Sequence, residues 1–206
     1  MRTIALLGAE STGKTELSHA IAGHFRGRGL EVAVVGEVLR EWCEREGRTP
    51  RPEEQLPIAQ EQQRRVDAAA RQADIVVADT TAVMVAIYSA MLFQDGSLYR
   101  FALEQQRGYD VTLVTGLDIP WVADGLQRDG PHVREPVDAQ VRQALADAGV
   151  PYRVVYGSGP ERLANALAAI DAGRLREKLA QPAWAWACDK CSDPECEHRL
   201  FTRLAR

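Results

Sequence analysis

The sequence has few cysteines, little net charge and no long apolar run. Only 4 of its 206 residues are cysteine, and three of these lie close together near the C-terminus, so no disulfide framework is spread across the fold. The formal net charge of −4 provides no general attraction to nucleic acid or to an anionic membrane. No apolar run approaches the roughly 20 residues of a membrane span, and the N-terminus resembles a strand instead of a signal peptide. We expect a soluble, cytoplasmic protein that binds neither nucleic acid nor membranes.

A phosphate-binding loop is predicted at residues 8–15, "GAESTGKT". Four residues separate Gly8 from Gly13, Lys14 and Thr15, which is the P-loop spacing. The apolar run before it suits a buried parallel strand, and the residues after it have helical periodicity. The alternative interpretation is a Gly-rich turn without phosphate binding, followed by an ordinary helix. In a P-loop, main-chain amides and the helix N-terminus hold phosphate groups, the lysine reaches the β- and γ-phosphates, and the hydroxyl binds Mg²⁺. We therefore expect ATP and Mg²⁺ as cofactors, bound by Gly8, Glu10, Ser11, Thr12, Gly13, Lys14 and Thr15.

Strands and helices alternate along most of the chain. The pattern predicts an α/β protein with the P-loop nucleoside triphosphate hydrolase/kinase fold, a five-stranded parallel sheet with helices on both faces. We expect residues 1–180 to form this P-loop kinase-like domain, with a Pro-rich loop at residues 49–57, "TPRPEEQLP". Ligands bind beyond the C-terminal ends of the strands in such sheets. The predicted strands lie within residues 2–7, 31–37, 74–81, 109–120 and 151–159.

Two carboxylates stand at the ends of predicted strands. Asp79 in "VVADTT" occupies the place where P-loop enzymes hold the Mg²⁺ shell, although an Asp there is also an ordinary helix cap. Glu37 is suited to accept the proton of a substrate hydroxyl, and Arg40 to hold a phosphoryl or ribosyl oxygen. In the alternative interpretation Glu37 caps the next helix, and Arg40 forms a solvated pair with Glu44.

A long segment rich in Gly and Pro follows the fourth predicted strand, at residues 118–135. Kinases close such a cover over the phosphates, exclude water and bring arginines to the transferred group. Trp121 could serve as a platform on which a flat ligand ring stacks. In the alternative interpretation, Trp121 packs into the core and the arginines form a solvated face. The candidate residues of this segment are Trp121, Asp124, Arg128 and Arg134.

Several motifs together resemble a known family. "GAESTGKTEL", "GEVLREW", "QQRRVD", "ADTT", "YDVTLVTGLDIPWVADG" and "VPYRVVYGSGPERL" occur in this order, within roughly residues 1–172. The chain resembles the nicotinamide riboside kinase domain of the bacterial multifunctional NAD-biosynthesis regulator and its stand-alone ATPase relatives. That resemblance implies transfer of the ATP γ-phosphoryl group to a small nucleoside, nicotinamide riboside, giving nicotinamide mononucleotide. The adenylyltransferase signature His-x-Gly-His and the DNA-binding helix-turn-helix of multifunctional members are absent from the sequence.

The resemblance also implies roles for individual residues. Glu37 and Arg40 match positions on the substrate side, and Asp79 matches the strand-end aspartate. Trp121 and Asp124 match the segment that holds the nicotinamide ring and its ribose, and Arg134 matches an arginine of the cover. Arg128 is offset by one position from the corresponding family arginine. Gly157 and Ser158 match the adenine-side loop. A regulatory or switch-type P-loop ATPase that acts through a protein partner is the alternative function, and the pattern is compatible with ATP or GTP and with any oligomeric state.

The C-terminal residues 181–206 form a separate Cys/His-rich tail, "CDKCSDPECEH", which the resemblance does not cover. Three thiolates and one imidazole suit a tetrahedral structural Zn²⁺ site. An unliganded or redox-active thiol cluster and an iron–sulfur site are the alternatives. The four candidate ligands are Cys188, Cys191, Cys196 and His198.

Overall fold

A five-stranded parallel sheet forms the centre of the protein. The computed structural model describes residues 2–122 and 130–180. The order of the strands in the sheet is β2-β3-β1-β4-β5, and every neighbouring pair is parallel. The predicted fold class is thereby confirmed. The strands are β1 (Arg2–Leu7), β2 (Val32–Val35), β3 (Ile75–Asp79), β4 (Val111–Thr115) and β5 (Arg153–Val155).

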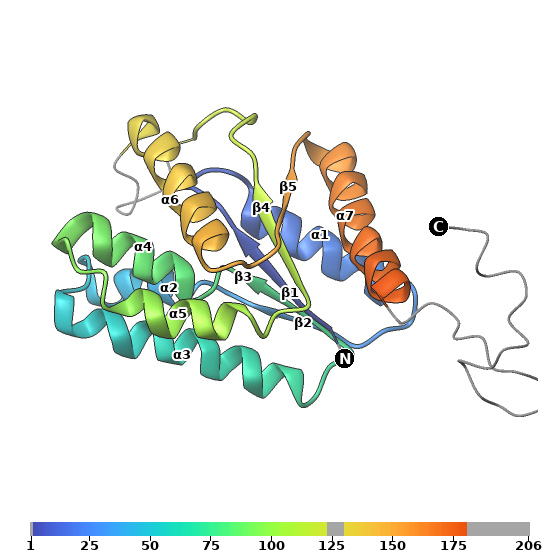
Figure 1. Ribbon diagram of the computed structural model, residues 1–206, viewed down its shortest axis with the longest axis horizontal. Helices are drawn as coiled ribbons and strands as arrows, with labels where there is room; N and C mark the ends of the chain where they lie inside the picture. The colour runs from blue at the N-terminus through green and yellow to red at the C-terminus, as the bar shows by residue number, and fades with distance from the viewer. Residues whose placement is uncertain (1, 123–129, 181–206) are drawn as a thin grey trace, which may run out of the picture. The chain divides into compact units, whose positions relative to one another are not determined.

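Helices cover both faces of the sheet, as the continuous apolar strands require. Helices α1 and α7 lie on one face, where Leu6 of β1 packs with Ile21 of α1 and Ile170 of α7. Helices α3 to α6 cover the other face (Figure 1). The helices are α1 (Lys14–Arg26), α2 (Val38–Glu46), α3 (Pro52–Ala70), α4 (Ala82–Phe93), α5 (Leu98–Gln106), the 3₁₀ helix η2 (Pro131–Val133), α6 (Arg134–Asp147) and α7 (Gly159–Ala180).

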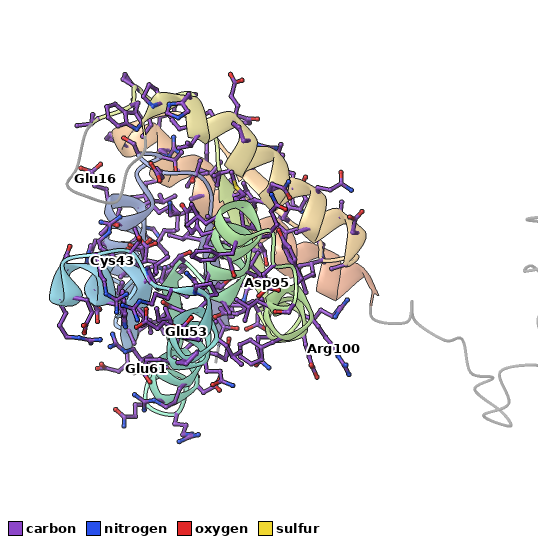
Figure 2. The ribbon with its side chains drawn as sticks, turned by 90° about the vertical axis from the view of Figure 1, so that its left-hand side faces the viewer. Glu16, Cys43, Glu53, Glu61, Asp95 and Arg100 are labelled. Atoms are coloured by element: carbon purple, nitrogen blue, oxygen red, sulfur yellow. The ribbon has the colours of Figure 1, made fainter. Side chains whose placement is uncertain are left out.

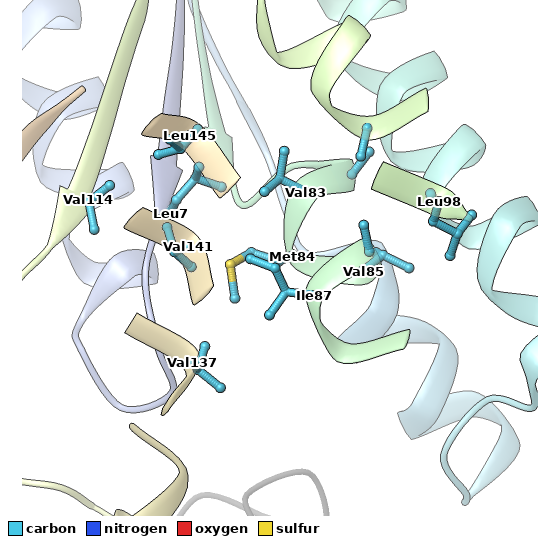
Figure 3. Close-up of a cluster of buried hydrophobic side chains, with 14 of the residues drawn as sticks. Leu7, Val83, Met84, Val85, Ile87, Leu98, Val114, Val137, Val141 and Leu145 are labelled. Carbon is cyan, nitrogen blue, oxygen red and sulfur yellow. The ribbon is translucent and has the colours of Figure 1, made fainter. Parts of the chain in front are cut away.

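Helix α4 lies at the centre of the largest apolar cluster (Figure 3). Its sequence, "AVMVAIYSAMLF", is apolar on nearly all sides, which is typical of a helix enclosed by other elements. Helix α6 adds Val137, Val141 and Leu145, which are spaced four residues apart and therefore share one face. Leu7 and Val114 at the ends of their strands complete the cluster, so the apolar core extends to the edge of the sheet where ligands are expected to bind.

The predicted loop at residues 49–57 is wrong, because helix α3 begins at Pro52. Proline is well suited to the first helical position, where its missing N–H would have no partner. The Arg51 N–H donates to the Glu54 carboxylate at 2.7 Å, which fixes the start of the helix. Pro57 lies inside the helix, and the burial of the next residue, Ile58, offsets part of the cost.

The chain divides into two compact units, and the boundary lies inside helix α7. The first unit ends at Ile170, and the second begins at Asp171. Our predicted boundary between residues 180 and 181 stays a prediction. No helix in the described part of the chain has the length and apolar character needed to cross a membrane.

Candidate functional site

The loop between β1 and α1 requires glycine at two positions. Gly8 has φ 144°, and a Cβ atom there would lie 2.2 Å from Thr115 Oγ1. Gly13 has φ 70° and immediately precedes α1. Both glycines allow the main chain to turn back sharply over the end of β4 and to enter the helix. The loop therefore presents main-chain amides next to the positive end of the α1 dipole, which is an arrangement suited to anions.

Lys14 lies within the loop that precedes it. Its side chain is buried, and Nζ donates to the main-chain oxygens of Gly8 at 3.0 Å and Ala9 at 2.8 Å. These bonds satisfy part of the donor capacity of the ammonium group and hold its charge beside the loop amides. The structure therefore places Lys14 where the sequence predicts a phosphate-binding cation.

Thr15 and Asp79 meet at the C-terminal edge of the sheet. Thr15 Oγ1 donates to Asp79 Oδ2 at 2.5 Å, and the Asp79 side chain is only 3% exposed. Asp79 Oδ1 is also buried and has no hydrogen-bond partner among the described residues. A hydroxyl and a carboxylate are the hard oxygen donors that Mg²⁺ prefers, so these residues fit that ion. Asp79 does not cap the following helix, because Thr81 occupies that position and accepts from the Val83 N–H.

Thr12 and Thr115 connect the loop to strand β4. Their hydroxyl oxygens are 2.7 Å apart, and both side chains are buried. The Thr12 hydroxyl is also 2.7 Å from the Ala9 carbonyl oxygen, and the Thr115 hydroxyl is 3.2 Å from the Leu7 carbonyl oxygen. Since each hydroxyl has one proton, two of these three contacts are hydrogen bonds at a time. These bonds fix the conformation of the loop against the ends of β1 and β4. Thr115 is not among the predicted site residues, because in the sequence it resembles an ordinary strand residue.

Glu37 and Arg40 form an ion pair at the start of α2. Arg40 NH2 lies 3.2 Å from Glu37 Oε2, and the Glu37 side chain is 13% exposed. Glu37 is the N-cap residue of α2 but makes no capping hydrogen bond through its side chain. The capping alternative is therefore not what the structure shows, and the carboxylate is held by its arginine neighbour instead.

Gln62 of α3 holds the ends of two strands together. The Val38 N–H donates to Gln62 Oε1 at 2.8 Å, and Gln62 Nε2 donates to the carbonyls of Gly36 at 3.2 Å and Thr80 at 3.4 Å. This buried amide therefore fixes the main chain on both sides of Glu37 and directly after Asp79. The helical pattern of the sequence gave no sign of this role.

Thr80 has a main-chain conformation that β-branched residues rarely adopt. Its φ is 77°, and its side chain is 1% exposed. The hydroxyl has no hydrogen-bond partner within residues 2–122 and 130–180. Thr80 directly follows Asp79, and because such strain is enriched at active sites, it makes this edge of the sheet a candidate functional site.

The segment after β4 lies against the phosphate loop. Ser11 Oγ accepts from the Val122 N–H at 2.8 Å. The neighbouring Trp121 is half-buried, and its Nε1 finds no hydrogen-bond partner in the described part of the chain. Arg134 is buried, and its NH2 donates to the carbonyls of Ile119 at 3.0 Å and Leu117 at 3.4 Å. Trp121 is therefore next in the chain to a residue that contacts the loop, and Arg134 bonds to the backbone that leads to it; the predicted role of Trp121 stays a prediction.

The predicted adenine-side loop is tied to the phosphate loop by Asp118 and Arg162. The Gly157 N–H donates to Asp118 Oδ2 at 2.6 Å, and Arg162 donates to the carbonyls of Gly157 at 2.6 Å and Thr12 at 2.8 Å. Burial acts to raise the pKa of Asp118, but the Gly157 amide and the Arg162 guanidinium outweigh it and hold the pKa below its ordinary value. Ser158 also belongs to this loop, and its carbonyl accepts from the Arg162 N–H at 3.3 Å. Neither Asp118 nor Arg162 is among the predicted site residues.

Six predicted site residues lie outside the described residues. Within residues 2–122 and 130–180, no group of three or more His, Cys, Asp or Glu side chains is arranged to hold a metal ion. The predicted zinc site is not in this range. The six residues are Asp124, Arg128, Cys188, Cys191, Cys196 and His198.

A pocket of about 350 Å³ lies between α2 and α3 and begins directly after Glu37. Val38, Trp42 and Ile58 contribute apolar surface, whereas glutamate and arginine side chains form its walls. Figure 2 labels Glu53 and Glu61 of these walls. No residue predicted as a site residue lines this pocket.

Cys43 of α2, also labelled in Figure 2, is a buried thiol. Burial, with Glu37 and Glu44 adding to it, raises its pKa to about 11.

Comparisons with known proteins agree with this fold. The family model described as "AAA domain" matches residues 3–162. A NadR protein solved in complex with NR has a TM-score of 0.66 at 21% identity, over 83% of this chain and 51% of that one. A NadR protein solved with NAD and AMP-PNP has a TM-score of 0.62 at 16% identity, over 90% and 52%. The chain therefore spans about half the length of these two structures.

A third similar structure is a thymidylate kinase from Ehrlichia chaffeensis, with a TM-score of 0.54 at 15% identity, over 87% of this chain and 98% of that one. The comparison with curated proteins gave no match. At these identities the structural likeness establishes the fold.

Proposed function

Since the chain belongs to the AAA-domain family, we propose that it is an ATP-dependent small-molecule kinase whose phosphoryl acceptor is nicotinamide riboside. The observation that carries the proposal is the hydrogen bond from Thr15 to Asp79 at the end of a loop that encloses the Lys14 ammonium. An amide-lined loop, one cation and two hard oxygen donors are the set that a nucleoside triphosphate and Mg²⁺ require.

The residues of the phosphate loop would bind and polarise the triphosphate. Main-chain amides of residues 8–13 and the Lys14 ammonium would neutralise charge on the β- and γ-phosphates, and Gly157 and Ser158 would lie on the adenine side. Thr15 and Asp79 would hold Mg²⁺, which when bound supplies further positive charge to the phosphate oxygens. The transition state of phosphoryl transfer is loose, so positioning and electrostatic stabilisation carry most of the acceleration.

Glu37 would orient the hydroxyl of the acceptor and take its proton. As the hydroxyl oxygen bonds to the γ-phosphorus, the bond to the β-phosphate bridging oxygen breaks and ADP leaves. The Arg40 pair holds the Glu37 carboxylate in one place, which supports this role. Arg128 and Arg134 would act from the cover, with Arg134 supporting the backbone at Ile119.

The identity of the acceptor rests on the family resemblance and on Trp121. Trp121 directly precedes Val122, whose N–H donates to Ser11 of the phosphate loop, and its own indole N–H has no hydrogen-bond partner within the described residues. A flat ring stacked on this tryptophan, with its ribose near Asp124, would bring a 5′-hydroxyl toward the loop. The NadR structure in complex with NR supports this choice by analogy of fold.

The decisive experiment combines a product assay with a variant of the loop. Purified protein with MgATP and nicotinamide riboside should form nicotinamide mononucleotide, detected by mass spectrometry. Lys14→Ala should lower kcat by at least about a hundredfold, since losing one preorganised donor to a transition-state oxyanion costs that much. Arg64→Met, which changes an exposed arginine of α3 paired with Glu61, is the matched control and should retain wild-type turnover.

Two results would contradict the proposal. ATP turnover that nicotinamide riboside does not stimulate, without any nicotinamide mononucleotide, would rule out this acceptor. Hydrolysis that responds to a protein partner and persists in Trp121→Ala would favour the regulatory ATPase.

We also propose a structural Zn²⁺ bound by Cys188, Cys191, Cys196 and His198. Metal analysis after chelator-free purification should give about one equivalent of zinc per chain, and less than about half an equivalent would contradict this site.

A further inference from the structure

Arg162 is a buried cation for which the proposed chemistry has no role. It lies in the first turns of α7, and its side chain is 6% exposed. A guanidinium group enclosed in this way is costly unless most of its N–H groups are bonded. Arg162 belongs to the motif "VPYRVVYGSGPERL", but the motif does not indicate which residues it contacts. Only the structure shows its hydrogen-bond partners.

Four of the five N–H groups of Arg162 have partners, and these belong to three separate segments. NH2 donates to the Thr12 carbonyl at 2.8 Å and to the Gly116 carbonyl at 3.4 Å. NH1 donates to the Gly157 carbonyl at 2.6 Å and to Asp118 Oδ1 at 3.2 Å. One side chain therefore connects the phosphate loop, the end of β4 and the loop between β5 and α7.

The bond to Thr12 determines the direction of a neighbouring amide. The peptide between Thr12 and Gly13 is trans and planar, so its C=O and N–H point in opposite directions. Arg162 fixes the carbonyl of this peptide on the α7 side of the loop. The Gly13 N–H consequently points to the other side and is held there without any contact to Gly13 itself.

We infer that Arg162 is a positioning residue, which aligns the Gly13 N–H for a phosphate oxygen of the bound triphosphate. The inference rests on the proposed use of the loop as a nucleotide site. Gly13 needs this external support because its φ of 70° is accessible to glycine but not enforced by it. Asp118 keeps the guanidinium in place, since it accepts from both NH1 and the Gly157 N–H.

Lysine cannot replace this arginine. An ammonium group has three donors around one point, whereas the contacts of Arg162 use the two ends of a planar fork. Arg162→Lys would retain the charge but would reach only part of the Thr12, Gly116 and Gly157 carbonyls. Arg162→Met would retain much of the side-chain volume and remove every bond.

Direct binding of inorganic tripolyphosphate with Mg²⁺ is the test, because this ligand engages the phosphate loop without an adenine ring. Calorimetric titration should show about ten- to hundredfold weaker binding in Arg162→Lys and Arg162→Met, which is the value of one aligned hydrogen bond to a charged group. MgATP should lose affinity by a similar factor. Arg64→Met is the control and should bind both ligands as the wild type does.

Thermal unfolding of each variant separates alignment from general stability. Variants that bind tripolyphosphate like the wild type below their melting temperature would overturn the inference, whatever their stability. If neither Arg162 variant folds, Asp118→Asn takes their place, because Asp118 is 32% exposed and its loss disturbs the core less. It should weaken tripolyphosphate binding about threefold or more, and unchanged affinity would overturn the inference.

The same titrations distinguish this inference from the proposed function. A wild-type protein that binds tripolyphosphate but forms no nicotinamide mononucleotide would refute the acceptor and leave the role of Arg162 supported by its variants. A wild-type protein that binds no triphosphate at all would refute both.

Discussion

Gly8→Ala should destabilise the folded protein by about 3 kcal/mol. The new Cβ would lie 2.2 Å from Thr115 Oγ1 and 3.2 Å from the Thr115 carbonyl oxygen, and Thr115 is fully buried. Forcing extra volume into a packed region costs about 1–3 kcal/mol, and a residue with φ of 144° adds roughly 1–3 kcal/mol of backbone strain. Urea unfolding followed by circular dichroism measures the change in the free energy of unfolding. In thermal unfolding, the melting temperature should fall by about 6–12 °C.

Three further variants, Gly149→Ala, Thr115→Ala and Gly8→Ala/Thr115→Ala, identify the cause of the loss. Gly149→Ala is the matched control, because Gly149 also has a positive φ of 64°, but a Cβ atom there would meet no other atom within 4 Å. It should cost only about 1 kcal/mol. In Gly8→Ala/Thr115→Ala the hydroxyl that collides is gone, so the double variant should be at least about 1 kcal/mol more stable than the sum of the single losses. Equal losses in Gly8→Ala and Gly149→Ala, or strict additivity with Thr115→Ala, would refute the packing argument.

Three other predictions follow from particular side chains. The pKa of Cys43 is raised to about 11 from 9.0, so at pH 8 iodoacetamide should alkylate Cys43 about a hundredfold more slowly in the folded protein than in urea; equal rates by peptide mass spectrometry would contradict this. The Arg48 side chain lowers the pKa of Glu54 from 4.5 to about 2. Any stability that this pair adds is therefore present above pH 4.5 and lost as the pH falls toward 2, and the difference in melting temperature between wild type and Glu54→Gln should shrink over that range. Thr80→Gly should raise the free energy of unfolding by about 1 kcal/mol in urea unfolding, since relief of a φ of 77° and removal of a buried hydroxyl outweigh the lost methyl group and the added chain entropy; a less stable variant would contradict the strain argument.

Local spacing in the sequence was sufficient to locate the loop between β1 and α1 and the carboxylate at the end of β3, while their roles in binding stay predictions. The phosphate loop, its flanking strand and helix, and Asp79 at the end of β3 all lie within short motifs, and the structure places Thr15 against Asp79. Alternation of apolar runs and helical stretches was sufficient to predict the five-stranded parallel sheet. The start of α3 was not predicted, because Pro52 and Pro57 are typical of loops and only the bond from Arg51 to Glu54 shows that a helix has begun.

The residues that support the site could not be predicted in this way. Arg162 and Thr12 are 150 positions apart in the chain, and Gln62 reaches the ends of two strands 26 and 18 positions away. Such contacts exist only once the sheet order is known. The positive φ of Thr80 opposes its residue type, so a propensity argument predicts the wrong conformation there.

Several buried polar atoms without hydrogen-bond partners lie at one edge of the sheet. Among the described residues, Asp79 Oδ1, Thr80 Oγ1, Trp121 Nε1, Arg134 Nε and Arg162 Nε are buried without a hydrogen-bond partner, and so, in other parts of the fold, are Arg2 NH2, Gln55 Oε1 and Ser89 Oγ. The first five lie close to the phosphate loop in the chain or through their contacts. Each belongs to the end of β3, to the segment after β4 or to residues that bond to that segment or to the phosphate loop. A buried polar group of this kind costs about 1–3 kcal/mol, and apolar residues of similar size would avoid the cost. Because five of these atoms lie near an amide-lined loop, where a triphosphate with its Mg²⁺ would satisfy several of them at once, their lack of protein partners agrees with the proposed nucleotide site.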